Sequence, residues 1–456
     1  MVGETRALAG FCSGLGFEDL PSEVVDKAKE CLLDWTGSAL AGSRLRPSVI
    51  VAGLVEALGG APESTVVNSV RKTSCVNAAL ANGVMSHILE LDDVHRASIL
   101  HPAAPIIPAA LALAEREGAD GRALIAAVVA GYEAGIRLGE AAGISHYRFW
   151  HSTGTCGAFG AAAASGVILG LDGEEMASAL GSAGTQASGL WQFMAEGAMS
   201  KHLHPGRAAS SGVLSALLAG GGFTGSPTII EGERGFCAAT SSDPRLDRVT
   251  EGLGRRFKIL ETSFKAHASC RHTHSAVDAA IRIREAGGLE AGEIAGVRVE
   301  TYPDALKIAG IDDPQSPHEA KFSLRYCVST ALLRGRLGVE EFTARALADP
   351  EVRELMERCE IVVEPDLSME YPARWPSRVE VTTRGGERLR DHVEYPLGDP
   401  ANPLPPEALT GKFRTLASKT LPEEEVEAVI DAVFRIEDIQ DVGQLTELLR
   451  PASTTS

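Results

Sequence analysis

Hydrophobic positions recur with helical spacing through about the first 260 residues of the chain. In the stretch SEVVDKAKECLLDWTGSALAG, Val25, Ala28 and Leu32 fall on one face of the predicted helix. Pro21–Ser22 precede this face as start signals. The same spacing predicts helices in SCVNAALANGVMSHILELDD, PAAPIIPAALALAEREG and GRALIAAVVAGYEAGIRLGEAAG, with Ser74 as the N-cap of the first.

After about residue 261 the pattern changes to the alternation that is typical of strands. The stretches IAGVRVETYP and CEIVVEPD are predicted strands, and two alternating runs around Gly385–Gly386 predict a hairpin. A helical stretch, EAKFSLRYCVSTALLRG, lies between them, and the pattern is helical again from about residue 405. The tail PASTTS is expected to have no regular structure.

These patterns predict a mainly α fold with two domains, because 456 residues are many for a single hydrophobic core. We expect residues 1–262 and 403–456 to form a large all-helical domain from both chain ends. Residues 263–402 are expected to form a smaller α+β domain that is inserted between them.

Charge and cysteine usage narrow the classes of protein. The net charge of −18 and the pI near 5.2 argue against nucleic acid and anionic membranes as partners. The eight scattered cysteines form no CxxC pair, and the N-terminus shows no signal-peptide pattern, so we expect free thiols in a cytoplasmic protein. The uncharged run of residues 154–171 is rich in Gly and Ala, which predicts a buried helix instead of a membrane span.

Most histidines gather in four polar stretches, whereas no GxGxxG follows a predicted strand and the motifs GxxxxGK[ST], HExxH and GxSxG are absent. The stretch GGGFTG at residues 220–225 is better explained as a turn. The four stretches are ELDDVHRASILHP, HSTGTCG, SKHLHPGRAASSG and SFKAHASCRHTHSAVDAA. A single histidine or lysine in such a stretch is more often structural than catalytic. His202, His267 and His272 are the most expendable of the group, and Cys270 is expected to be a small buried residue.

The four stretches permit two kinds of chemistry. Asp92, Asp93, His95 and His101 are metal-ligand types and could serve a metal-dependent hydrolase, although neighbouring Lys and Arg would repel a cation. Cations and histidines around acids suit a small polycarboxylate better. Fixed positive donors stabilise the charge that builds up when a proton is removed beside a carboxylate, and neutral His or Lys can move that proton.

The same stretches resemble the MmgE/PrpD family, which includes 2-methylcitrate dehydratase, cis-aconitate decarboxylase and iminodisuccinate epimerase. The resemblance covers almost the whole chain in the same order, and HPAAPIIPAALALAE and KHLHPGRAA are its most specific stretches. It implies that the α+β domain is a lid, that the pocket lies between the domains, and that the protein is a homodimer. It also implies that no metal or organic cofactor is needed.

Residue by residue, the resemblance implies the following roles. The expected catalytic residues are His101, His151, Lys265 and Asp93, with Asp93 orienting a neighbour. The expected substrate-binding residues are Lys201, Arg271, His274, Glu90, His95 and His204, and no metal ligands are expected.

The favoured function is a lyase that dehydrates a small di- or tricarboxylate such as 2-methylcitrate. Glu90 and Val94 stand where the decarboxylase motif has Asp and Thr, and the segment around Ile308 lacks the family's lid tyrosine. Decarboxylation of cis-aconitate and epimerisation of an iminodisuccinate-type substrate remain alternatives within the family. A helical binding module without catalysis is the third class.

Overall fold

The computed structural model describes residues 3–451, and the last five residues of the predicted tail lie outside this range. Within it the chain forms two compact units. Residues 3–88, 92–262 and 405–451 make up one unit, here called the helical unit. Residues 89–91 and 263–404 make up the other, called the α/β unit.

The helical unit contains most of the helices, and the predicted mainly α class is confirmed. Its strands are the short β1 (Ser64–Thr65), β2 (Lys72–Thr73) and β3 (Val94–His95), which the helical pattern of the sequence did not predict; β4 (Thr262–Ser263) spans the boundary between the units. Its helices are α1 (Glu4–Gly14), α2 (Ser22–Gly42), α3 (Arg46–Leu58), α4 (Cys75–His87), α5 (Ala103–Glu117), α6 (Gly121–Tyr147), α7 (Ser152–Ile168), α8 (Gly173–Gly184), α9 (Phe193–Glu196), α10 (Ser200–Gly220), α11 (Phe236–Thr240), α12 (Asp247–Thr250), α20 (Pro406–Ala417), α21 (Glu423–Phe434) and α22 (Gly443–Glu447).

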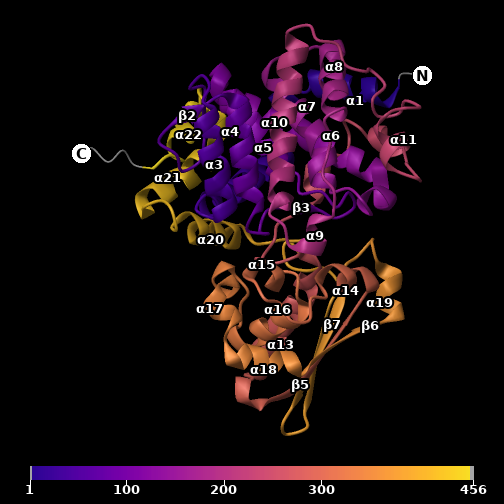
Figure 1. Cartoon of the computed structure of the whole chain (residues 1–456), viewed down its shortest axis with the longest axis vertical. Coiled ribbons are helices and arrows are strands. Elements are labelled where there is room, and N and C mark those ends of the chain that lie inside the picture. The colour runs from indigo at the N-terminus through magenta and orange to yellow at the C-terminus, as the bar shows by residue number, and fades with distance from the viewer. Residues whose placement is uncertain (1–2, 452–456) are drawn as a thin grey trace. The chain divides into compact units, whose positions relative to one another are not determined.

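The core of this unit is the group α4, α5, α6, α7 and α10, which pack against one another (Figure 1). Small residues permit this close approach. A Cβ atom added at Gly160 of α7 would lie 2.7 Å from the carbonyl oxygen of Gly131 of α6. The Gly- and Ala-rich run of residues 154–171 is therefore mostly a buried packing helix, and no helix of the described residues is long and apolar enough to cross a membrane.

The predicted helix boundaries are largely confirmed. Ser74 is the N-cap of α4 and accepts a hydrogen bond from the backbone N–H of Asn77. The helix ends at His87, so the ELDD segment that follows is not helical. The C-terminal helices α20 and α21 pack on α2.

The α/β unit is built on one four-stranded sheet with strand order β6-β5-β7-β8. Strands β5 (Ile294–Thr301) and β6 (Cys359–Val363) are parallel, whereas β5 pairs antiparallel with β7 (Ser377–Thr383), and β7 with β8 (Arg388–Val393). The predicted hairpin at Gly385–Gly386 is the turn between β7 and β8. Helix α13 packs on β7 and β8 and also on α16 (Figure 1). The helices of this unit are α13 (His274–Gly287), α14 (Pro303–Ala309), α15 (Pro317–Ala320), α16 (Leu324–Arg334), α17 (Ala344–Leu347), α18 (Pro350–Glu357) and α19 (Pro365–Glu370).

Candidate active site

Three histidine rings form a compact group in the helical unit. His87 is the last residue of α4, His101 lies two residues before α5, and His151 is the N-cap residue of α7. The ring centroids of His87 and His101 are 4.9 Å apart, those of His87 and His151 are 5.6 Å apart, and those of His101 and His151 are 6.5 Å apart. The ends of three helices thus bring together imidazoles that are far apart in the sequence.

The loop that carries His101 is pressed against α6. A Cβ atom added at Gly139 of α6 would lie 2.7 Å from the Cβ of Ser98, and one added at Gly135 would lie 3.3 Å from Leu100. The backbone N–H of His101 donates to the hydroxyl of Thr153 in α7 at 3.1 Å. Ile99 in this loop has a φ of 49°, a left-handed conformation that is strained for a β-branched residue. Such strain is concentrated at functional sites, where the surrounding packing maintains it.

Hydrogen bonds define the protonation of His101. Its Nδ1 lies 2.7 Å from the carbonyl oxygen of Asp93, which only accepts, so Nδ1 carries the proton of the neutral ring. Nε2 therefore bears the lone pair. The Asp92 carboxylate lies 3.4 Å from the same Nδ1 and 2.7 Å from Nδ1 of His87. His101 is the partly exposed member of the three rings, whereas His87 and His151 are buried.

The Asp93 carboxyl group lies beneath this loop and is fully buried. Its Oδ2 accepts a hydrogen bond from the hydroxyl of Tyr132 at 2.7 Å, and its Oδ1 accepts from the backbone N–H of Ala103 at 3.0 Å. Burial raises the pKa of Asp93 to about 8, because the charged form loses its hydration. This carboxyl group therefore changes its protonation state near neutral pH.

His151 and His204 form a pair of neutral bases. Their Nδ1 atoms are 3.1 Å apart, so one of the two nitrogens donates and the other accepts. Burial lowers the pKa of His151 well below its usual value, and the positive charge of Lys201 lowers it further. Burial also lowers the pKa of His204 to about 4, with added effects of His87 and Lys201. Lys201, on α10, is itself buried.

A second cluster of predicted residues lies in the α/β unit. Lys265 Nζ is 3.4 Å from Glu90 Oε2, and both side chains are almost completely buried. Glu90 has a φ of 57°, the left-handed region that is uncommon for residues other than glycine. The short 3-10 helix Arg271–Thr273 precedes α13 and places Arg271 Nη1 3.1 Å from His274 Nδ1 and 3.0 Å from the carbonyl oxygen of Leu397.

The histidines of this second cluster are held neutral. Burial and the charge of Arg271 lower the pKa of His274 well below its usual value. Burial and the charge of Lys265 lower the pKa of His272 to about 3. His272 Nδ1 lies 2.7 Å from the Tyr302 hydroxyl, and its ring stacks on Trp375, so its contacts are structural, as the sequence suggested. His267 Nε2 lies 2.7 Å from Asp278 Oδ1.

His95, a predicted substrate-binding residue, belongs to a different group of side chains. Its Nδ1 lies 2.9 Å from the Ser98 hydroxyl, and its Nε2 lies 3.4 Å from Glu261 Oε2. Both ring nitrogens therefore face groups of the protein itself. Although burial raises the pKa of Glu261, the hydrogen bond and charge of His95 and the charge of Lys258 lower it to about 2.

Two groups of side chains in the described residues have a geometry that could hold a metal ion. In the first, one ligand atom each of His87, Asp92 and His101 lie within 4.8 Å of one another. The Nδ1 atoms of both histidines carry protons for their hydrogen bonds to oxygen, so a metal could use only the Nε2 atoms of these rings.

The second group is His95, Glu140 and Glu261. Lys258 Nζ lies 3.0 Å from Glu140 and 3.2 Å from Glu261, so a lysine already supplies the positive charge. The donor set of this second group therefore fits a metal poorly.

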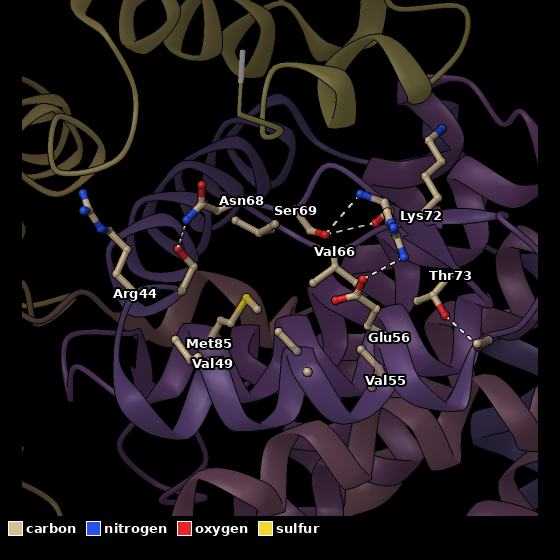
Figure 2. Close-up of a pocket in the computed structure, with 16 residues that line it drawn as sticks. Arg44, Val49, Val55, Glu56, Val66, Asn68, Ser69, Lys72, Thr73 and Met85 are labelled. Carbon is tan, nitrogen blue, oxygen red and sulfur yellow. Dashed lines mark hydrogen bonds and ion pairs between the residues drawn. The ribbon is translucent and has the colours of Figure 1, made fainter. Parts of the chain in front are cut away.

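A pocket of about 680 Å³ lies elsewhere on the helical unit, between α3 and the segment that carries β1 and β2 (Figure 2). Its floor includes Val49, Val55 and Met85, and none of the predicted site residues lines it. Two of its cationic residues already have carboxylate partners: Arg71 lies 2.9 Å from Glu56, and Lys72 lies 2.7 Å from Glu115. The pocket is thus chemically unlike the histidine clusters.

His87 and Tyr132 are the members of the site that sequence reasoning did not assign. His87 precedes Asp92 by five residues, and the pairing of an imidazole with a carboxylate at this spacing was a usable signal. Tyr132 reaches Asp93 across 39 positions of the chain, and no local pattern indicates such a contact.

The sequence is similar to known proteins over most of its length. The MmgE/PrpD N-terminal domain model matches residues 6–249, and the MmgE/PrpD C-terminal domain model matches residues 267–436. The chain is 28% identical to a cis-aconitate decarboxylase of Aspergillus terreus, over 98% of this chain and 96% of that protein, and 29% identical to the human cis-aconitate decarboxylase, over 98% and 95%. It is 28% identical to a 2-methylcitrate dehydratase of Cupriavidus necator, over 58% of this chain and 57% of that protein. The two domain models together span most of the sequence, and the chain belongs to the MmgE/PrpD family.

Proposed function

We propose that this protein is a cofactor-independent lyase that acts on a small di- or tricarboxylate by moving a proton at a carbon next to a carboxylate. The observation that carries the proposal is the group of His101, His151 and His204, in which Nε2 of His101 bears the lone pair and burial keeps the other two rings neutral. Neutral imidazoles are the general bases that such a proton transfer needs near neutral pH.

The proposed roles follow from position and charge. His101 Nε2 takes the proton from carbon, with His151 as the alternative base, and Lys265 supplies a proton to the departing hydroxyl group or to the product carbon. Lys201, Arg271 and His274 bind carboxylates, and fixed positive charge stabilises the carbanion-like state that forms beside a carboxylate. Glu90 and His204 contact the substrate or orient the side chains that bind it. The metal-dependent hydrolase has no support from the family comparison.

Dehydration is the first candidate reaction. A base removes the proton on one carbon, and the hydroxyl group on the next carbon leaves as water after it gains a proton. Glu90 and Val94, which stand where the decarboxylase motif has Asp and Thr, support this choice. Decarboxylation is the second candidate, because the cis-aconitate decarboxylases match over nearly the whole chain, whereas the dehydratase of Cupriavidus necator matches over 58%.

The test is proton NMR of the purified protein with 2-methylcitrate, citrate, cis-aconitate and iminodisuccinate in deuterated buffer. The His101→Asn variant runs beside wild type, and His392→Asn is the matched control, because His392 is an exposed histidine on β8 outside both clusters. We expect turnover or deuterium incorporation that His101→Asn loses and His392→Asn keeps. The product names the reaction, and deuterium exchange with inversion alone would identify an epimerase. Binding without exchange on every substrate would refute the lyase proposal and favour a binding module.

We also propose that the protein is a homodimer, and the exposed face of α3 supports this. Only Ser48 and Val55 of this thirteen-residue helix are buried, whereas Ile50, Leu54 and Leu58 are each more than half exposed. Contiguous apolar surface of this kind marks interaction sites. A helix face of this kind can pack against the same face of a second copy about a two-fold axis.

Sedimentation analysis tests the dimer. The Leu54→Glu variant is expected to shift the protein to monomer, whereas Met369→Glu, at an exposed residue of the α/β unit, is expected to leave the dimer intact. A wild-type protein that sediments as a monomer at micromolar concentration would refute the proposal.

We also propose a cytoplasmic location. The eight cysteines, all of which are buried and form no disulfides, support it.

A further inference from the structure

Tyr132 stands out among the buried titratable groups that the proposed reaction does not use. It lies in the middle of α6, and its side chain has no exposed surface. Its hydroxyl donates to Asp93 Oδ2 at 2.7 Å, and the buried thiol of Cys31 in α2 lies near it. A buried tyrosine hydroxyl normally needs a hydrogen-bond partner. Here the partner, Asp93, belongs to the same loop as His101.

Asp93 links Tyr132 to His101 through two different parts of the same residue. The carboxyl group is held from one side by Tyr132 and from the other by the backbone N–H of Ala103, at the first turn of α5. The main-chain carbonyl of Asp93 accepts the Nδ1 proton of His101 at 2.7 Å. The orientation of this carbonyl sets both the position of the imidazole and the nitrogen that bears the lone pair.

The surroundings make Tyr132 the polar anchor of an otherwise apolar contact. The same helix faces the loop with glycines, and a Cβ atom added at Gly135 would lie 3.3 Å from Leu100. These contacts keep the loop close to α6 but provide no directional bond. The hydroxyl of Tyr132 is the group of α6 that bonds to the Asp93 side chain.

We propose that Tyr132 is a positioning residue, which acts through Asp93 to keep His101 in a single tautomer with the lone pair on Nε2. This inference rests on the proposed role of His101 as the base. Tyr132 does not touch the substrate in this proposal. It supports the catalytic residue from behind, in the way that outer partners of a histidine commonly fix its ring and tautomer.

The test is the Tyr132→Phe variant, which removes one oxygen atom and keeps the ring. We expect kcat to fall about tenfold, which corresponds to about 1.4 kcal/mol, while KM stays near the wild-type value. Because the hydrogen bond from Tyr132 lowers the pKa of Asp93, its loss should also shift the pH profile of kcat to higher pH. The matched control is Tyr326→Phe, which removes a buried hydroxyl that donates to the carbonyl oxygen of Glu341 in the α/β unit.

A readout without substrate separates this inference from the proposed function. In protein labelled with ¹⁵N-histidine, the His101 signals are identified by their loss in His101→Asn. Wild type and Tyr326→Phe should show Nδ1 protonated and Nε2 unprotonated, whereas in Tyr132→Phe the two ring signals should move toward each other. An unchanged tautomer together with an unchanged kcat would overturn the proposal. Absence of turnover in wild type would count against the lyase function, while the tautomer measurement would still decide the role of Tyr132.

Discussion

The buried pair of Lys265 and Glu90 offers the sharpest separation of stability from catalysis. Their side chains are 1% and 2% exposed, and Nζ lies 3.4 Å from Oε2. Lys265→Met keeps the length of the side chain and removes its charge, so the buried Glu90 carboxylate loses the ammonium group that lies 3.4 Å from it. Removing one partner of a buried ion pair lowers the free energy of unfolding by about 3–5 kcal/mol. We expect the variant to lose stability in this range and Glu90 to take up a proton.

The double variant Lys265→Met/Glu90→Gln removes both charges. A neutral pair of similar volume avoids most of the penalty, so the double variant should regain most of the lost unfolding free energy. Turnover should not return with stability, because the proposed proton transfer needs the lysine amine. Arg6→Met is the control, since Arg6 and its partner Glu174 are exposed and such a pair contributes about 0.2–1 kcal/mol.

Urea unfolding followed by tryptophan fluorescence measures stability, and the polycarboxylate assay measures turnover on the same samples. An unfolding midpoint of Lys265→Met equal to that of wild type would refute the claim that the two charges depend on each other. A double variant that recovers both stability and turnover would show that Lys265 has only a structural role.

Three further predictions address the loop, the histidines and the metal question. Gly139→Ala should lower the free energy of unfolding by about 1–3 kcal/mol and reduce turnover, because the added methyl group would lie 2.7 Å from Ser98 and displace the His101 loop. The control is Gly10→Ala in α1, where the methyl group meets no atom within 4 Å, and it should change neither urea unfolding nor turnover. The unfolded chain takes up a proton on His272 near pH 6.5 but the folded protein only near pH 3, so stability falls as the pH drops through this window. In urea unfolding between pH 4 and 6.5, His272→Asn should reduce the dependence of the unfolding free energy on pH by up to about 1.4 kcal/mol per pH unit. An unchanged pH dependence would show that the ring takes up its proton at the same pH in the folded protein as in the unfolded chain. Dialysis against EDTA should leave turnover unchanged, because the proposed proton transfer uses imidazole and amine groups of the protein alone; a loss that zinc or manganese restores would revive the metal-dependent alternative.

The amino-acid sequence by itself determined the local elements and the chemical types at the site. The spacing of Val25, Ala28 and Leu32 predicted α2, Ser74 predicted the start of α4, and the alternating runs around Gly385–Gly386 predicted the β7–β8 hairpin. These features depend on neighbours three or four positions apart in a helix, or directly opposite in a hairpin, and a local pattern records such neighbours. The motif residues also identified the family, because their order along the chain is retained.

Tertiary structure alone decided which of those residues meet and in which protonation state. The separation of 53 positions between His151 and His204, and of 175 between Lys265 and Glu90, leaves no periodic trace in the sequence. His95 is predicted to bind substrate from its motif, and only folding shows that its two ring nitrogens lie against Ser98 and Glu261. The physical reason is that burial and the charges of distant neighbours set each pKa, and both arise only when the helices pack.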